Sequence, residues 1–252
     1  MQLASSLKFG VPSTLNWHYD EWFAPVAGDV SHPAIIESIT YVDESRIQDH
    51  PFFAAAGVSR DILRLWVSQE LIVTNPFAQL LMNLAASLGH VHIRSMIMQI
   101  ARGEHGPLRD RVAPLAHPWL LHQLGGSVGL TPGDVTPFAE TVEFLREIES
   151  ACATSPLTAV GVLGMGSERL LIPEYTAIKG AFETGWPDCD FRRFLDANIT
   201  EDEQHASLME VVAASMIELG ADPSDFVKGT QIGVDSRITY YTRLHQRVAG
   251  LG

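Results

Sequence analysis

The stretch FLDANITEDEQHASLMEVVAASM, residues 194–216, has the periodicity of a long helix packed in the core of an all-α protein. Steps of three and four residues define its core-facing stripe: Phe194, Asn198, Asp202, His205, Met209, Val212 and Met216. The apolar members of the stripe fix which side faces the core, so the three polar members are expected there too. Asp202 and His205, three residues apart, then lie side by side as two ligands of one metal would.

Three other expected helices carry a carboxylate within an apolar stripe. Glu104 continues a stripe of isoleucines, Glu168 lies among apolar or small residues, and Glu70 falls between Trp66 and Val73. Burying a charge costs roughly several kcal/mol unless the charge is paired or bound to a metal. We therefore expect the side chains of Glu104 and Glu168 to converge with the pair on the long helix.

Each carboxylate also has an ordinary interpretation. Glu104 is in the last turn of its helix, where a glutamate is usually solvated, and Glu168 could form a salt bridge with Arg169 or Lys179. The repetition across four helices favours a cation site, because a cluster of buried carboxylates without a cation is strongly destabilising.

Two histidines flank the loop that follows Glu104. His105 closes one expected helix, and His117 opens the next, whose leucines dock it on the core. We therefore choose His117 over His105 as the histidine ligand.

The remaining pattern predicts a bundle of about seven helices in one domain, residues 1–252. The expected helices are 59–89 with a kink near Pro76, about 90–104, one from 117, one from 136–137, about 155–182, about 190–219, and one from about 223 to the C-terminus. Residues 1–58, rich in aromatics and proline, are expected to form a packed lead-in segment, with a short helix in HPAIIESITYV (32–42).

Composition limits the classes of partner. A net charge of -13 disfavours nucleic acid and anionic membranes, and no apolar run approaches the roughly 20 residues of a membrane-spanning helix. Without an evident secretory signal we expect a cytoplasmic protein, and we leave homodimerisation open. Only Cys152 and Cys189 are present, so any metal site uses histidines and carboxylates.

Four motifs follow one another along the chain: GEHG (103–106), HPWLLHQLGGSVGL (117–130), SERLLIPEYTAI (167–178) and FLDANITEDEQHASL (194–208). This order of a glutamate, a histidine, a second glutamate and a His-x3-Asp-x2-His motif resembles the heme-oxygenase-like diiron oxidases and oxygenases. These proteins bind iron and no haem. The resemblance covers roughly residues 59–220.

The resemblance implies a heme-oxygenase-like fold, two Fe²⁺ ions and O₂ as co-substrate. By position, the implied ligands are Glu104, His117, Glu168 and the Asn198 position for one iron, and Asp202 and His205 for the other, with a bridging carboxylate. The family has histidine where this chain has Asn198, and a neutral amide oxygen is a poor iron ligand. Glu70 resembles the extra carboxylate of the N-oxygenating members.

We accordingly expect oxygenation of a small amine or amino-acid-like metabolite, at nitrogen, in a pocket walled by Trp66, Phe77, Met165 and Tyr175. Oxidative C–C cleavage of an amino acid or fatty acid is the alternative within the family. A metal-free, thiaminase-like enzyme is a second alternative, which Asn198 favours. A non-catalytic helical binding protein is a third, favoured if the buried carboxylates pair with Arg102, Arg169 or Arg193.

Overall fold

A computed structural model describes residues 36, 41–107, 109 and 113–250, and these residues form an all-α bundle in which no β-strand occurs. Its longer helices are α5 (Arg60–Thr74), α6 (Phe77–Ser87), α7 (Val91–His105), α8 (His117–Ser127), α9 (Ala139–Cys152), α11 (Arg169–Gly185), α12 (Arg192–Glu218) and α13 (Pro223–Ala249). The expectation of an all-α protein is confirmed. Within the part of the chain that the structure describes, no helix is long and apolar enough to cross a membrane.

Most of the expected lead-in segment, residues 1–35 and 37–40, and with it most of the helix expected in 32–42, lies outside the described residues. Its described part forms two short helices, α3 (Ser45–Gln48) and α4 (Pro51–Gly57), which periodicity did not indicate. Phe52 and Phe53 of α4 are buried, so this part packs on the bundle as expected.

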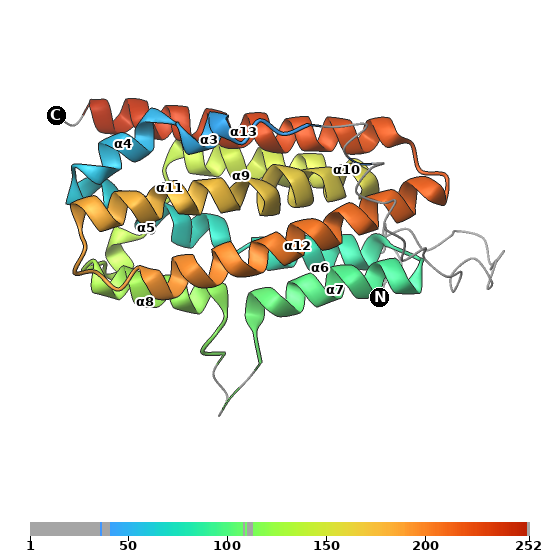
Figure 1. Cartoon of the computed structure of the whole chain (residues 1–252), viewed down its shortest axis with the longest axis horizontal. Coiled ribbons are helices and arrows are strands. Elements are labelled where there is room, and N and C mark those ends of the chain that lie inside the picture. Colours follow the sequence, from blue (N-terminus) through green and yellow to red (C-terminus); the bar gives the residue numbers. More distant parts are fainter. Residues whose placement is uncertain (1–35, 37–40, 108, 110–112, 251–252) are drawn as a thin grey trace, which may run out of the picture.

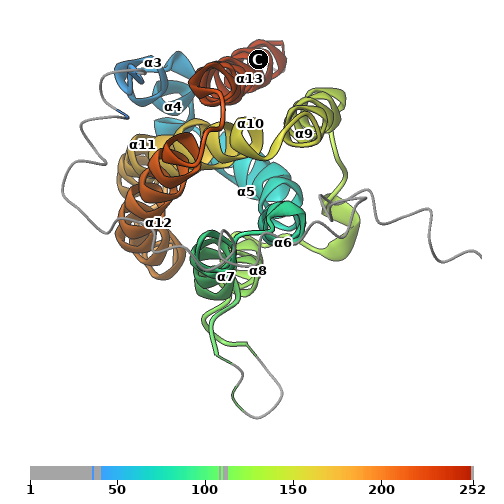
Figure 2. The same cartoon turned by 90° about the vertical axis from the view of Figure 1, so that its right-hand side faces the viewer.

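The long helices run along the longest axis of the molecule. In Figure 1, α13 runs along the top of the view, α11 lies below it, and α12 crosses the view below α11. Figure 2 looks along this axis and shows α7 and α8 together at one edge, α12 beside them, and α13 at the opposite edge. Residues from α7 and α12, about 100 positions apart in sequence, thus come together at one side of the bundle.

The start of α5 follows the expected capping residue, whereas the start of α9 does not. The Ser59 side chain accepts a hydrogen bond from the backbone N–H of Ile62, and α5 begins immediately after it. The helix expected for 59–89 with a kink near Pro76 is divided at that place into α5 and α6, because Pro76 has no N–H to donate. The fourth helix begins at Ala139, not at residues 136–137, which form part of the preceding loop.

The fifth expected helix is a composite of α10 (Pro156–Val160), a π-helix η2 (Gly161–Glu168) and α11. The wider turns of η2 pack closely on α13, since a Cβ atom on Gly166 would lie 2.6 Å from Cα of Gly233. Alanine at either position would force the two helices apart. Periodicity at 3.6 residues per turn does not predict this π segment.

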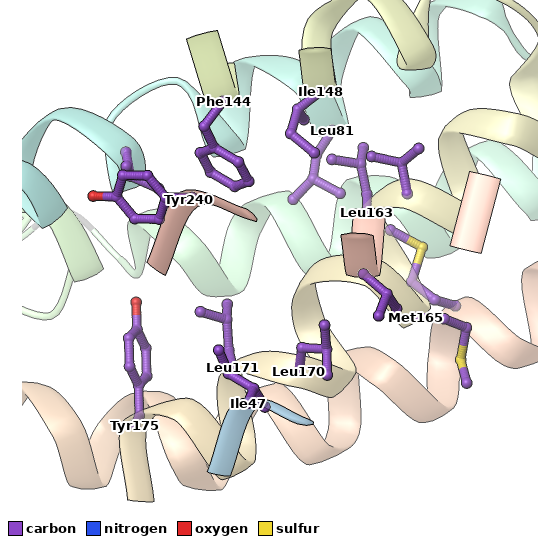
Figure 3. Close-up of a cluster of buried hydrophobic side chains, with 14 of the residues drawn as sticks. Ile47, Leu81, Phe144, Ile148, Leu163, Met165, Leu170, Leu171, Tyr175 and Tyr240 are labelled. Carbon is purple, nitrogen blue, oxygen red and sulfur yellow. The ribbon is translucent and has the colours of Figure 1, made fainter. Parts of the chain in front are cut away.

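The core is continuous from η2 and α11 across to α9 and α13. Figure 3 shows buried side chains from these elements gathered in one cluster, among them Leu163, Leu170, Phe144, Ile148 and Tyr240. This cluster holds η2 against its neighbours, and η2 ends at Glu168.

Candidate metal centre

Four buried side chains from three helical segments converge at one place in the bundle. Glu104 comes from α7, Glu168 from the end of η2, and Asp202 and His205 from α12. Each offers one ligand atom, and these atoms all lie within 4.8 Å of one another. The structure therefore brings together the four residues whose convergence the apolar stripes predict.

Two glycines leave room for α12 at this site. A Cβ atom on Gly103 would lie 2.6 Å from Nε2 of His205, and one on Gly164 would lie 2.7 Å from Cβ of Met209. The imidazole of His205 thus occupies space that any other residue at position 103 would need. Small residues beside Glu104 and within η2 allow three helices to approach closely enough for their polar side chains to meet.

The contacts within the cluster leave several polar atoms without hydrogen bonds. Nδ1 of His205 lies 3.4 Å from Oε1 of Glu104 and 3.4 Å from Oε1 of Glu168. Both oxygens of Glu168, Oδ2 of Asp202 and Nδ1 of His205 are buried without a hydrogen-bond partner. Because buried polar atoms are nearly always satisfied, these orphaned atoms indicate a missing partner at the centre of the cluster.

The cluster shifts the pKa of each of its members. Burial, with the neighbouring Glu104, raises the pKa of Glu168 to about 7, and burial with Glu168 and Glu104 raises that of Asp202 well above its usual value. Burial opposes ionisation of Glu104, but His117 and His205 hold its pKa down to about 2. Burial and the neighbouring carboxyls thus make Glu168 and Asp202 costly to ionise, and a cation among them would remove that cost.

His117, the first residue of α8, lies beside Glu104. Its Nδ1 is 3.1 Å from Oε2 of Glu104, and its Nε2 is 3.2 Å from Oε2 of Glu201. The ring is 1% exposed, whereas His105 is an exposed residue at the end of α7. The sequence did not single out Glu201, whose side chain is 44% exposed and lies off the core stripe of α12.

Asn198 and Glu70 border a small cavity next to the cluster. This cavity of about 20 Å³ is also lined by Glu104 and Asp202. The amide nitrogen of Asn198 donates to the Phe194 carbonyl at 2.7 Å, which leaves its second N–H and its oxygen for other partners. Glu70 is not among the four converging residues.

Glu70 accepts hydrogen bonds at Oε1 from the Tyr175 hydroxyl at 2.8 Å and the Thr74 hydroxyl at 3.2 Å, and its Oε2 has no partner. Burial, together with the nearby Glu174, raises the pKa of Glu70 to about 7. Glu70 is therefore a carboxyl that can carry a proton close to the cluster at neutral pH.

The four expected wall residues of the substrate pocket divide into two pairs. Phe77 and Tyr175 line the small cavity, but Trp66 and Met165 do not. Trp66 is fully buried and donates its indole N–H to the Tyr241 hydroxyl at 2.9 Å. Trp66 and Met165 belong to the hydrophobic core cluster and are not among the residues that line this cavity, so their expected place in the wall of the substrate pocket stays a prediction.

A second buried polar network lies behind Glu70. Arg237 of α13 donates to Oε2 of Glu174 at 2.7 Å, and the Tyr241 hydroxyl donates to its Oε1 at 2.6 Å. Arg237 also lines the small cavity. Sequence reasoning missed this pair, although Arg237 lies between Val234 and Tyr241 at steps of three and four and the same stripe argument finds it.

The basic residues proposed as alternative partners are engaged elsewhere or lie apart. Arg169 pairs with Glu44 at 2.7 Å, and Lys179 pairs with Asp196 at 2.6 Å. Arg193 donates to the side chain of Gln123 at 2.9 Å. Among the described residues, no ion pair joins Arg102, Arg169 or Arg193 to the carboxyls of the cluster, so the condition that favoured a non-catalytic binding protein is not met.

The donor set fits iron. Mixed imidazole and carboxylate ligands suit first-row divalent ions such as ferrous iron, and a thiolate site is excluded because neither cysteine lies in the cluster. The orphaned oxygens of Glu168 and Asp202 are placed to accept a cation.

Comparisons with known proteins agree with this site. A family model described as an iron-containing redox enzyme matches residues 64–238, which include all of the residues of the cluster. The search of curated proteins found no match.

Two crystal structures of a CADD-like protein of unknown function from Nostoc punctiforme share the fold. One is 18% identical with a TM-score of 0.69 and covers 87% of this chain and 99% of its own. The other is 15% identical with a TM-score of 0.64 and covers 86% of this chain and 94% of its own. At this identity the likeness concerns the fold alone, and it agrees with the heme-oxygenase-like bundle expected from the motifs.

Proposed function

The chain belongs to the family of iron-containing redox enzymes, and from this premise we propose that it is a non-haem, dinuclear iron oxygenase of a small amine or amino-acid-like metabolite. The observation that carries the proposal is the convergence of Glu104, Glu168, Asp202 and His205 within 4.8 Å, with buried carboxylate oxygens that have no protein partner. The preferred outcome is oxygenation of the amine nitrogen.

The residues that would hold the irons are those of the cluster and its flank. Glu104, His117 and Glu168 would hold one ion, with the Asn198 oxygen as a weak addition, while Asp202 and His205 would hold the other with a shared carboxylate. Ferrous ions in such a site supply the electrons and the open coordination positions that dioxygen activation requires. The number of ions and the use of O₂ are part of the proposal.

The protein's own contribution is to exclude water and to manage protons. The four converging residues are at most 8% exposed, so charges that develop at the site are poorly screened by solvent. Glu70 holds a proton near neutral pH at its carboxyl group and is oriented by the hydroxyls of Tyr175 and Thr74. Because a pKa near 7 leaves part of Glu70 ionised at neutral pH, the position of its carboxylate beside the cluster supports a role in accepting and returning protons at the centre, including the proton that an amine substrate must lose before its nitrogen can react.

A metal-free enzyme of the same fold is the competing function, since Asn198 replaces an imidazole. Metal analysis separates the two. We expect the protein to bind ferrous iron anaerobically and to show a new absorption band after exposure to O₂. Replacing Glu168 by glutamine is expected to lower the iron stoichiometry, whereas Glu203→Gln, on an exposed part of α12, serves as the control and leaves it unchanged.

The residue at position 198 determines how much iron we expect the protein to retain. We expect the iron beside Glu104 to be held loosely in the wild type, so that the protein carries one iron or none until excess ferrous iron is added. Asn198→His is expected to raise iron retention, because a neutral imidazole is the stronger ligand. No iron bound in the wild type at saturating ferrous iron would contradict the proposed function. Two tightly held irons, unchanged in Asn198→His, would instead assign the missing ligand to another residue.

A further inference from the structure

Two spaces of very different size adjoin the metal centre. The inner cavity, between Glu70 and Asp202, has a volume of about 20 Å³, while a cavity needs roughly 10–15 Å³ to hold one water. It therefore accommodates one molecule the size of water or dioxygen. The outer space is a groove of about 1180 Å³ between α7 and α12, larger than the roughly 300–1000 Å³ of ordinary ligand pockets.

The groove reaches the metal centre at His205. Its lining includes Gly103, Glu201 and His205, and His205 is one of the four converging residues. Gly103 presents no side chain at this point, so the imidazole edge of His205 is left open to the groove. Figures 1 and 2 both show α7 and α12 side by side along this part of the bundle. A substrate of several atoms thus fits beside the centre only on the groove side.

The groove wall formed by α7 carries positive charge in a chain whose net charge is -13. Arg94 and Arg102 both line it, and neither guanidinium has an ion-pair or hydrogen-bond partner among the described residues. Eight residues separate them, which places them about 12 Å apart along the helix. Two unpartnered arginines on one concave wall are complementary to an anionic ligand.

Apolar side chains lie between and opposite the two arginines. Met98 lies midway between Arg94 and Arg102, and Leu115 and Leu208 line other parts of the groove. Met98 is 46% exposed and Leu115 is 45% exposed, which is high for large apolar residues. A ligand that covers them would bury apolar area while its charged end contacts an arginine.

We propose that the substrate enters along this groove and is an amphipathic organic anion, whose carboxylate or phosphate binds Arg94 and whose apolar part covers Met98. The anionic group anchors the molecule on α7, so that its other end points over His205. This inference rests on the proposed function for the identity of the metal centre. It names the class of substrate, and it places the substrate in the groove because the inner cavity is too small for it.

Methionine methyl NMR on the metal-free protein tests the site directly. The protein has seven methionines, and labelling them with ¹³C gives one signal for Met98 and one for Met82, which is exposed on α6 away from the groove. Titration uses octanoate, octyl phosphate, and octylamine as the cationic counterpart. We expect both anions to shift Met98 and not Met82, and octylamine to bind at least about tenfold more weakly.

Arginine variants test the charge. Arg94→Gln is expected to weaken binding of the preferred anion about tenfold, whereas Arg146→Gln, on the exposed side of α9, leaves it unchanged. The tighter of octanoate and octyl phosphate identifies the anionic group as a carboxylate or a phosphate.

The inference is overturned if neither anion shifts Met98, if octylamine binds equally well, or if Arg94→Gln binds the anion like the wild type. Because the titration uses metal-free protein, such a failure leaves the iron stoichiometry test intact. Failure of iron binding with normal anion binding would refute the proposed function and leave the groove as an anion site.

Discussion

Replacing Gly103 by alanine is expected to lower the affinity of the site for iron without lowering the stability of the fold. Within a helix, alanine in place of glycine ordinarily stabilises the fold by about 0.5–1 kcal/mol. Here the new Cβ would lie 2.6 Å from Nε2 of His205 and 3.0 Å from its Cε1. To restore an ordinary contact of roughly 3.5 Å, the imidazole must move by about 0.9 Å.

That displacement is large for a metal ligand, because coordination distances are held to within about 0.2 Å. Nδ1 of His205 is only 3.4 Å from Glu104 and from Glu168, so the ring cannot move without changing its place among the other ligands. We expect Gly103→Ala to lower affinity for ferrous iron by about 10- to 100-fold while leaving the fold as stable as the wild type.

The assay is anaerobic titration with ferrous iron, followed by thermal unfolding of the metal-free protein. Gly180→Ala is the matched control, because Gly180 lies inside α11 and a Cβ there meets nothing within 4 Å. The control is expected to gain up to about 1 kcal/mol of stability with unchanged iron affinity. Wild-type iron affinity in Gly103→Ala would refute the assignment of His205 as a ligand in the observed rotamer.

Three further outcomes follow from the same geometry. His117→Ala is expected to lose iron while His105→Ala keeps it, measured as metal content after gel filtration, since only the former is buried against the cluster; loss in the second variant alone would reverse the choice. In denaturant titrations, Arg237→Met should lower the free energy of unfolding by about 3–5 kcal/mol, because it leaves the buried carboxylate of Glu174 unpaired. The control Arg46→Met, which breaks an exposed pair with Asp235, should lower it by at most about 1 kcal/mol. The pKa of Glu168 is raised from 4.5 to about 7, so the folded metal-free protein binds this proton more tightly than the unfolded chain; its stabilisation is complete below about pH 4.5 and is lost as pH rises through 7. Melting curves in chelator at pH 5.5 and 8 should show this decline, and a rise in stability over that range would contradict it.

The sequence predicted which groups are buried better than it predicted what they contact. A period of 3.6 residues places Asp202 and His205 on the core side of α12, and it extends the α7 stripe to Glu104. It carries no information on how helices cross. Trp66 and Met165, expected in the wall of the substrate pocket, lie in the hydrophobic core and are not among the residues that line the inner cavity.

Contacts between helices explain the residues that were missed. Glu201 lies next to the core stripe, and only the placement of α8 brings His117 within 3.2 Å of it. The groove between α7 and α12 likewise depends on both helices, so Arg94 and Arg102 have no distinguishing pattern within α7 alone. The π-helix η2 also lies beyond periodicity, although its glycines mark close packing.

Two buried glutamates in one helical run show how a metal ligand differs from a salt-bridge partner. Glu168 and Glu174 lie six residues apart and are both fully buried, so burial does not distinguish them. Glu174 has its oxygens satisfied by Arg237 and Tyr241, whereas both oxygens of Glu168 lack a hydrogen-bond partner and face an imidazole and two other carboxyls. A protein has no energetic reason to gather three buried carboxyls without a counter-ion, because like charges at this distance raise the cost of ionising each of them. The salt-bridge interpretation, which the sequence allowed for Glu168, describes Glu174 instead. The carboxyls of Glu104, Glu168 and Asp202 are the ones that require a cation.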